Sequence, residues 1–253
     1  AYEIRNCDWS SDVCSSDLTH PASDVEAVGT SCFWHSTVGT DDSGRAVTPI
    51  ITWADTRPAA FVVSLGDTIS PTAYHALSGC MQHSSFWPAR LRWWRQGDPK
   101  AFARIRRFMS PGEWLLGRVA GLATCSHSMA SATGIYDTQQ RRWSATLLDL
   151  AGIPVDALQP IDDSGAHPGL GSRRRWPRFA DARWFPAIGD GAAGSLGSGA
   201  TGTGHMALNY GTSAALRIMR RQPPRALPYG LFADRKITRL NSSHSSVSRM
   251  PSS

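Results

Sequence analysis

The sequence lacks the features that would assign it to several common classes of protein. No run of about eighteen apolar residues is present, so no transmembrane helix is predicted. Residues 1–18 have neither the basic start nor the apolar middle of a secretory signal peptide. Five cysteines, an odd number without regular spacing, argue against a disulfide scaffold and are typical of a reducing compartment such as the cytoplasm.

Common catalytic and metal-binding signatures are also missing. There is no GxxxxGK[ST] phosphate loop and no GxSxG nucleophile elbow. Two residues separate Cys32 from His35 and Cys80 from His83, but neither pair has the CxxC or HxxxH form of a usual zinc half-site. The sequence therefore predicts no metal site built from protein side chains alone.

The charge is moderately basic, with 26 Lys and Arg residues against 20 Asp and Glu residues and a net charge of +6. Such a balance suits a nucleic-acid partner or an anionic small substrate such as a nucleotide. The basic residues are dispersed among Trp, Leu and Ala and do not form a basic tail. We therefore expect neither a nucleic-acid partner nor a membrane partner.

Both ends of the chain differ in composition from the middle. Residues 7–18 and 236–253 lack hydrophobic periodicity, and the second tract is Ser-rich and not expected to build a core. Pieces of a widely used sequencing adapter would encode residues 12–18, 239–244 and 248–253. We interpret 1–18 and 236–253 as translated adapter. An ordinary disordered tail is the alternative, and the nucleotide sequence distinguishes the two.

The middle, residues 19–235, alternates strand-like and helical patterns, which predicts an α/β fold. Residues 25–36 and 46–53 resemble strands joined by a turn at 41–44, which suggests a hairpin. Helical patterns, several of them bounded by Pro or Gly, cover 71–79, a segment starting at 88, 102–109, 114–119 and 143–150. We expect an exposed loop at 160–176 and short strands at 184–188, 207–210 and 214–219.

The segment 187–199, AIGDGAAGSLGSG, carries the strongest chemical signal. Asp190 directly follows an apolar strand and lies between Gly189 and Gly191. Glycines allow a substrate to approach the backbone closely, and an Asp at a strand end can accept a proton from a substrate hydroxyl. The alternative is a Gly-rich turn in which the Asp bonds its own backbone.

Two further segments contain candidate binding residues. In NYGTSAALR, residues 209–217, the Gly211-Thr212-Ser213 turn offers N–H groups and hydroxyls to a phosphate chain, although an ordinary tight hairpin has the same pattern. In SCFWHST, residues 31–37, His35 can hydrogen-bond a polyol; a core histidine is the alternative.

The segment IITWADTR, residues 50–57, supplies the remaining candidates. Trp53 can stack on the apolar face of a sugar, with a core tryptophan as the alternative. Asp55 and Arg57 are two residues apart and so share one side of an extended chain; a surface ion pair is the alternative.

These segments occur in the order found in FGGY carbohydrate kinases, which the sequence resembles. TWADTR resembles the family's W-x-D-x-R stretch, and WPARLRWW resembles its P-x-K-L-x-W segment with Arg90 where Lys is usual. SMASATGIYD resembles a third block, GDGAAGSLGSG resembles the block that holds the catalytic Asp, and GTSAALR matches a second phosphate-contacting motif. Five motifs in order across residues 19–235 make the resemblance strong.

The resemblance implies a ribonuclease-H-like (actin-like ATPase) fold. Residues 19–208 would form part of the N-terminal sugar-binding domain, and 209–235 would begin the C-terminal ATP-binding domain. ATP, with Mg²⁺, and the sugar would meet between the domains, where Asp190 would act as the catalytic base. The residues implied in binding are His35, Trp53, Asp55 and Arg57 for the sugar, and Gly211, Thr212 and Ser213 for the ATP phosphates.

The implied activity is ATP-dependent phosphorylation of a sugar or sugar-acid hydroxyl, with gluconate favoured and xylulose next. A homodimer of a longer parent protein is left open. The family's first phosphate loop and most of the ATP-binding domain are not in the sequence, so the 253-residue chain is itself expected to lack kinase activity. A non-catalytic sugar-binding fragment is the alternative of a different class.

Overall fold

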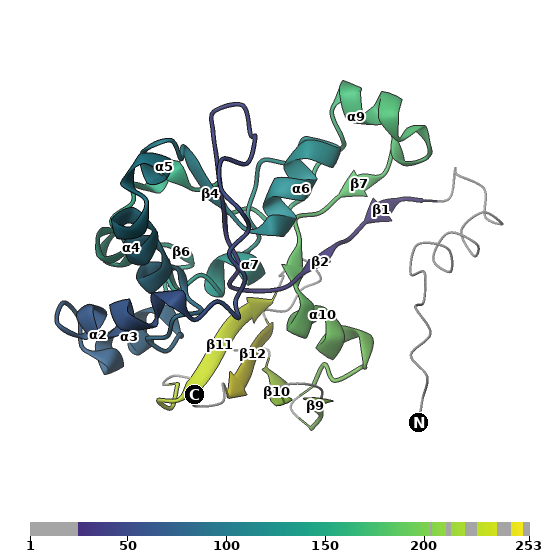
Figure 1. The fold of residues 1–253 in the computed structure, drawn as a ribbon. Helices are drawn as coiled ribbons and strands as arrows, with labels where there is room; N and C mark the ends of the chain where they lie inside the picture. Colours follow the sequence, from purple (N-terminus) through teal and green to yellow (C-terminus); the bar gives the residue numbers. More distant parts are fainter. Residues whose placement is uncertain (1–24, 203, 211–213, 221–226, 237–243, 250–253) are drawn as a thin grey trace, which may run out of the picture.

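The computed structural model describes residues 25–202, 204–210, 214–220, 227–236 and 244–249 (Figure 1). The α-helices are α2 Ala60–Gly66, α3 Pro71–Ser78, α4 Trp87–Gly97, α5 Pro99–Ala103, α6 Pro111–Ala120, α7 His127–Ser131, α8 Ala145–Ala151, α9 Leu170–Arg175 and α10 Asp190–Gly197. The strands are β1 Ala27–Val28, β2 Ser31–Cys32, β3 Val38–Thr40, β4 Arg107–Met109, β5 Tyr136–Asp137, β6 Arg142–Trp143, β7 Arg183–Trp184, β8 Ile188–Gly189, β9 Met206–Tyr210, β10 Ala214–Arg220, β11 Leu231–Lys236 and β12 His244–Arg249.

Local capping signals account for most of the helix ends. Helix α3 starts at Pro71 after the Ser70 cap and ends at Gly79, which has a left-handed φ of 70°. In α6 the Ser110 hydroxyl accepts from the Glu113 N–H while the Glu113 carboxylate accepts from the Ser110 N–H, forming a capping box. The helices predicted at 71–79, 88 onward, 114–119 and 143–150 are confirmed within a few residues.

Pairs of short strands bring distant segments together. The parallel pairs β1–β7 and β2–β8 join the start of the described chain to residues 183–189. The antiparallel pair β3–β4 joins 38–40 to 107–109. A four-stranded antiparallel sheet has the order β11-β12-β10-β9, and the strands predicted at 207–210 and 214–219 are its neighbours β9 and β10.

Several sequence-based predictions of local structure are wrong. Residues 25–36 form two strands, because the register with their partner segment shifts by one residue between the pairs Val28–Trp184 and Ser31–Ile188. Residues 46–53 form no continuous strand, although the isolated antiparallel bridges of Thr40 with Ala46 and of Thr37 with Ile51 fold them back across the predicted turn at 41–44. Strand β3 pairs along its length with β4, which lies inside the segment predicted as helical at 102–109.

Two segments are more helical than the sequence suggested. The predicted loop 160–176 contains α9, and the Gly-rich stretch after Gly189 contains α10 despite its three glycines. The Ser-rich tract 236–253, not expected to build a core, supplies strand β12, which pairs with β10 and β11.

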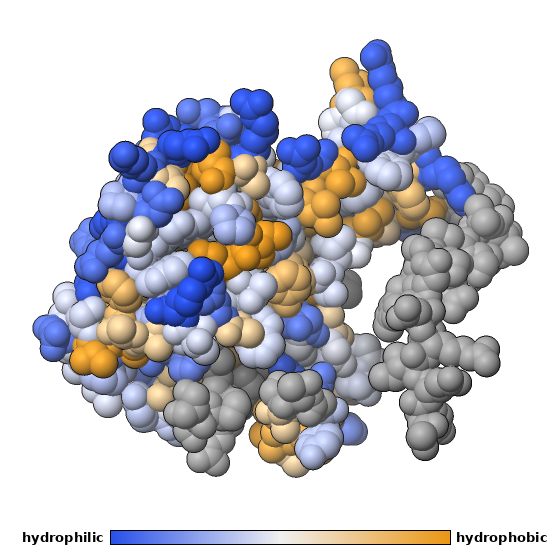
Figure 2. All heavy atoms as spheres, viewed as in Figure 1, coloured by the Kyte–Doolittle hydropathy of each residue, from blue (hydrophilic) through white to orange (hydrophobic). Residues whose placement is uncertain are grey.

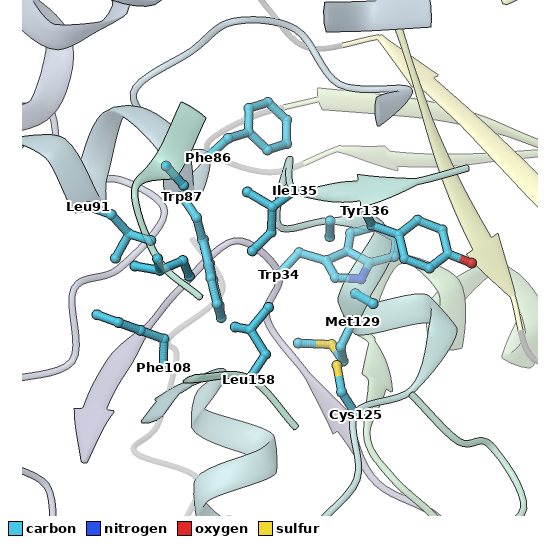
Figure 3. Packing of buried hydrophobic residues seen from close by; sticks show 14 of the residues in the cluster. Trp34, Phe86, Trp87, Leu91, Phe108, Cys125, Met129, Ile135, Tyr136 and Leu158 are labelled. Carbon is cyan, nitrogen blue, oxygen red and sulfur yellow. The ribbon is translucent and has the colours of Figure 1, made fainter. Parts of the chain in front are cut away.

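The buried core lies mainly between the helices and the short strands of residues 32–192. Trp87, Leu91 and Phe108 pack on one side of this core, and Trp34 and Tyr136 lie on the other (Figure 3). Hydrophilic side chains gather on the projecting α9, whereas apolar side chains are exposed around β9 (Figure 2). None of the helices in the described ranges has both the length and the hydrophobicity needed to cross a bilayer.

Candidate functional site

Asp190 lies where two parallel strands end side by side. Strand β8 stops at Gly189, and Asp190 is the exposed first residue of α10, with its Oδ1 accepting from the Gly191 N–H at 2.8 Å. Its neighbour β2 ends at Cys32, so the segment Phe33-Trp34-His35 leaves the sheet at the same edge. In open α/β sheets this carboxyl edge is where ligands usually bind.

Buried hydroxyls from a third segment hold β8 in place. The Ser128 Oγ accepts from the Gly189 N–H at 3.1 Å, and the Ser126 Oγ donates to the Ala187 carbonyl at 2.6 Å. Both serines are fully buried. The SMASATGIYD block, which begins at Ser128, therefore supports the backbone that presents Asp190.

Close packing at Gly189 brings Trp34 against the strand that carries Asp190. A methyl group placed on Gly189 would lie 1.7 Å from Trp34 Cε2, so only glycine fits there. The Trp34 ring also contacts Phe232 of β11 edge-on, with ring centroids 5.8 Å apart.

His35 is held rigidly beside this edge in a left-handed conformation, with φ of 64°. Its Nδ1 lies 2.6 Å from the Ala132 carbonyl and must donate, because a carbonyl oxygen can only accept. The ring packs edge-on against Phe86 and Phe232, and burial lowers the pKa of His35 to about 4. His35 is therefore neutral at pH 7, with Nδ1 already used.

Arg90 ties the His35 segment to the Trp53 segment. Its fully buried guanidinium donates to the carbonyls of His35, Ile51, Thr52 and Ser85. Burial lowers the pKa of Arg90 to about 10, and at pH 7 it remains a cation. Four acceptors suit the five N–H donors of Arg better than the three of Lys, which explains how Arg serves where the resembled family usually has Lys.

Asp55 and Arg57 pair with each other. The Arg57 Nε lies 2.9 Å from Asp55 Oδ1, and its Nη2 lies 2.5 Å from Oδ2. Hydrogen bonding from Arg57 lowers the pKa of Asp55, so the carboxylate is ionised at neutral pH. The guanidinium also stacks over Trp93 at 4.5 Å. The ion pair named as the alternative is present, and both groups are already partnered.

Trp53 lines an open cleft of about 1270 Å³. The cleft lies between the Trp53 loop, the C-terminal half of α10 and strand β9, and its lining includes Gly194, Ser198 and Asn209. Asp190, at the other end of α10, is not part of the lining. The structure thus places Trp53 near the C-terminal end of α10 and Asp190 at its N-terminal end, while His35 follows the strand that ends beside Asp190.

The predicted phosphate-binding residues Gly211, Thr212 and Ser213 lie outside the described residues. The strands around them are described, and Tyr210 pairs with Ala214 in an antiparallel hairpin. The strand–turn–strand arrangement predicted for this segment is therefore confirmed on both sides of the turn.

The described residues contain no cluster of three or more His, Cys, Asp or Glu side chains that could hold a metal ion. Burial raises the pKa of Cys32 to about 11, with the nearby Asp190 and Glu113 adding to the effect, so its thiol stays neutral. Mg²⁺ in phosphoryl transfer takes one or two carboxylates together with substrate phosphates. The single exposed carboxylate of Asp190 fits a magnesium ion that arrives with a nucleotide.

Sequence reasoning missed several residues at this edge. Trp34 and Arg217 lie against Gly189 and Gly191, and Ser126 and Ser128 support β8. The glycines on both sides of Asp190 indicate that a bulky group packs against the backbone there, but the sequence does not identify which side chain it is.

Comparison with known proteins agrees with this arrangement. Residues 7–173 match the model of the N-terminal domain of the FGGY family of carbohydrate kinases, and the match begins inside the segment interpreted as adapter. Gluconokinase of Bacillus subtilis is 22% identical over 81% of this chain and 40% of its own length. Xylulose kinase of Escherichia coli is 25% identical over 77% of this chain and 40% of its own length.

Solved structures give the same result for the fold. A gluconate kinase from Lactobacillus acidophilus superposes with a TM-score of 0.77, at 22% identity, over 88% of this chain and 45% of that protein. The chain thus spans about 40% of the length of the curated relatives named above. The fold is the ribonuclease-H-like fold of these kinases.

Proposed function

Because the chain belongs to the FGGY family of carbohydrate kinases, we propose that it is part of an ATP-dependent kinase that phosphorylates a sugar or sugar-acid hydroxyl, with Asp190 as the base. The observation that carries the proposal is the position of Asp190 at the carboxyl end of β8, beside the end of β2 from which His35 follows. An exposed carboxylate on a rigid strand end meets the geometric need of a general base.

In the proposed mechanism Asp190 accepts the proton of the attacking hydroxyl as its oxygen bonds to the γ-phosphorus of ATP and the bond to the β-phosphate oxygen breaks. Positioning and charge stabilisation supply most of the catalysis in such transfers. Gly211, Thr212 and Ser213 would hold the phosphates. Asp190 would be the nearby carboxylate for Mg²⁺, which would supply neutralisation of the phosphate charge.

His35 and Trp53 are proposed to contact the sugar. Neutral His35 has its Nδ1 committed to Ala132, which leaves Nε2 as a hydrogen-bond acceptor for a hydroxyl. Trp53 is 47% exposed at the cleft, so its ring face is accessible for stacking. Asp55 and Arg57, already paired, are proposed to orient the Trp53 loop near the sugar.

Replacement of Asp190 tests the proposal in a protein that joins this chain to an ATP-binding half. Asp190→Asn keeps the shape but cannot take a proton, so turnover should fall by at least about a hundredfold while sugar binding persists. Asp181→Asn, at an almost fully exposed carboxylate, is the matched control and should leave turnover unchanged. Normal turnover in the Asp190→Asn enzyme would exclude Asp190 as the base.

Gluconate is the proposed substrate and xylulose the second candidate, since relatives carrying each name match at similar identity. Comparing kcat/KM for gluconate, xylulose and glycerol decides between them, and a highest value for xylulose would replace the first proposal. We place the activity in the cytoplasm, where ATP is abundant and the three described cysteines would stay reduced.

A non-catalytic sugar-binding role remains the second candidate for the isolated chain. The open cleft beside Trp53 favours it, because this cleft is lined by described residues, of which only Asn209 and Tyr210 fall in the segment assigned to the ATP-binding domain. Sugar binding by the 253-residue chain without phosphoryl transfer is the expected outcome. Robust ATP-dependent phosphorylation by the purified chain would contradict it.

A further inference from the structure

Three buried N–H groups near Asp190 have no hydrogen-bond partner within the described part of the chain. They are the Nε1 of Trp34 and the Nε and Nη1 of Arg217. Trp34 is only 6% exposed, so its indole N–H is shielded from bulk water. Buried donors are almost always paired in folded proteins, and an unpaired one destabilises the fold, so these groups require an acceptor.

The donors approach Asp190 from both of its neighbours. A methyl group placed on Gly191 would lie 2.6 Å from the Cζ, Nε and Nη2 of Arg217, so the guanidinium rests directly on that glycine. A methyl group placed on Gly189 would lie 1.8 Å from Trp34 Nε1. The Arg217 guanidinium lies over the Trp34 ring, with its Cζ 6.0 Å from the ring centre, so the N–H groups of the two side chains are neighbours.

Asp190 accepts a hydrogen bond from none of these three N–H groups. Its Oδ1 accepts from the Gly191 N–H, and no ion pair between Asp190 and Arg217 is present among the described residues. Guanidinium and indole N–H groups are donors only, and the guanidinium keeps its positive charge at any physiological pH. A ligand that completes this donor set must therefore supply acceptor oxygens, and the positive charge favours an anionic one.

We propose that Arg217 and Trp34 form an oxyanion-binding site beside Asp190. The proposal rests on the kinase function proposed above and adds two ligand-binding residues to it. The shared chemistry is a charged oxygen, which comes either from a phosphate group of ATP or from the carboxylate of a sugar acid. Arg217 lies three residues beyond Ala214 on β10, about 10 Å along the strand, and is not one of the phosphate-binding residues proposed at 211–213.

Titration calorimetry on the 253-residue chain tests the site with three probes: sodium tripolyphosphate, sodium gluconate and uncharged sorbitol. Arg217→Gln removes the charge and should weaken binding of the relevant anion by about tenfold or more, because charge-assisted hydrogen bonds are lost. Arg220→Gln changes an exposed arginine on the same strand and should alter binding by less than about twofold. Sorbitol binding should be insensitive to both.

Two further variants guard against a folding defect in the first. Trp34→Phe keeps an aromatic ring against Gly189 but removes the N–H, and it should weaken the same anion by about threefold or more. Gly191→Ala adds a methyl group where the guanidinium lies and should reproduce the loss seen for Arg217→Gln. Thermal melting of each variant shows which of them keep the native fold.

The anion that responds identifies the source of the oxygen. Loss of tripolyphosphate affinity assigns the site to ATP phosphate, and loss of gluconate affinity assigns it to the sugar-acid carboxylate. Equal losses in Arg217→Gln and Arg220→Gln, or failure of both anions to bind the wild-type chain, overturn the site. Asp190→Asn should retain anion binding. In the protein that joins this chain to an ATP-binding half, Arg217-dependent anion binding without phosphoryl transfer would refute the kinase function and leave the oxyanion site standing.

Discussion

At the scale of single residues, Gly189 determines how closely Trp34 can approach the strand that presents Asp190. Alanine at 189 would place its methyl group 1.7 Å from the Trp34 ring, so the ring or the strand must move. We expect Gly189→Ala to lower the free energy of unfolding by about 3 kcal/mol. Gly97→Ala has nothing within 4 Å and should change it by less than about 1 kcal/mol in urea unfolding. Equal effects of the two variants would contradict the packing at Gly189.

His35 makes the stability of the chain depend on pH. Its pKa is about 4 in the folded protein and near 6.5 when unfolded, so the unfolded chain binds more protons between these values. The contribution of His35 is fully present above pH 6.5 and is lost as the pH falls toward 4. The expected loss is about 3 kcal/mol.

Urea unfolding at several pH values checks this expectation against His35→Asn. Asn tolerates the left-handed conformation at φ of 64° but has no group that titrates there. The difference in the free energy of unfolding between the wild-type chain and His35→Asn should be constant above pH 6.5 and should become smaller below it. The pKa of the nearby His83 is also lowered, but His83 is present in both proteins and cancels. A difference independent of pH would contradict burial of neutral His35.

Residue identities at the candidate site were predictable only where one segment carries the signal. Asp190 follows a strand and lies between two glycines, and this local pattern, together with the family resemblance, made it the candidate base. Trp34 and Arg217 reach the same place through strand pairs that join segments far apart in the chain. Nothing in their own neighbourhoods distinguishes them from core or surface residues.

At the scale of elements, Arg90 of α4 connects two loops to the helical core. It donates to carbonyls in the His35 segment, in the strand-like segment 51–52 and at Ser85. We expect Arg90→Ala to lower the free energy of unfolding by about 3 kcal/mol or more, because buried carbonyls lose their donors. Arg90→Lys should cost less, since an ammonium group can serve some of the acceptors.

Arg104→Ala makes the same chemical change at an exposed position and should alter stability by less than about 0.5 kcal/mol. Thermal or urea unfolding of Arg90→Ala, Arg90→Lys and Arg104→Ala measures the order of their losses in stability. A cost for Arg90→Ala no larger than that of Arg104→Ala would show that the guanidinium does not hold the loops.

Elements with local stop and start signals were predictable, and elements made by long-range pairing were not. Pro71, Gly79 and Gly152 mark helix ends that the structure confirms. Strand β4 sits in a segment with helical spacing, and it is extended because Arg107 to Met109 pair with β3. Short strands gain their stability from the partner and not from their own sequence.

At the scale of the whole molecule, the terminal sheet β9–β12 adds little to the buried core. Of the fully clustered core residues in the described ranges, Phe232 alone comes from outside residues 32–192, and it packs against Trp34. Since residues 236–253 are proposed to be translated adapter, a chain ending at Arg235 should keep its melting temperature within about 2 °C. Amide exchange in β10 and β11 should speed up, because both pair with β12.

A fall of more than about 5 °C on this truncation would mean that β12 is an integral part of the fold and would contradict the adapter interpretation. Residues 20–24 are kept in the shortened chain, because they adjoin β1. The control is a comparison within that chain: its melting, followed by Trp fluorescence as a report on the core, is compared with amide exchange in the sheet.

The parallel pair β2–β8 determines when the candidate site can form during synthesis on the ribosome. Ser31 pairs with Ile188, about 160 residues later in the chain. At 5–20 residues per second, roughly 8 to 30 s pass between synthesis of the two strands. During that interval β2 has no partner, and the edge that will carry Asp190 does not exist. Trp34 therefore lacks its packing partner until Gly189 has been made, so the candidate site cannot form before then.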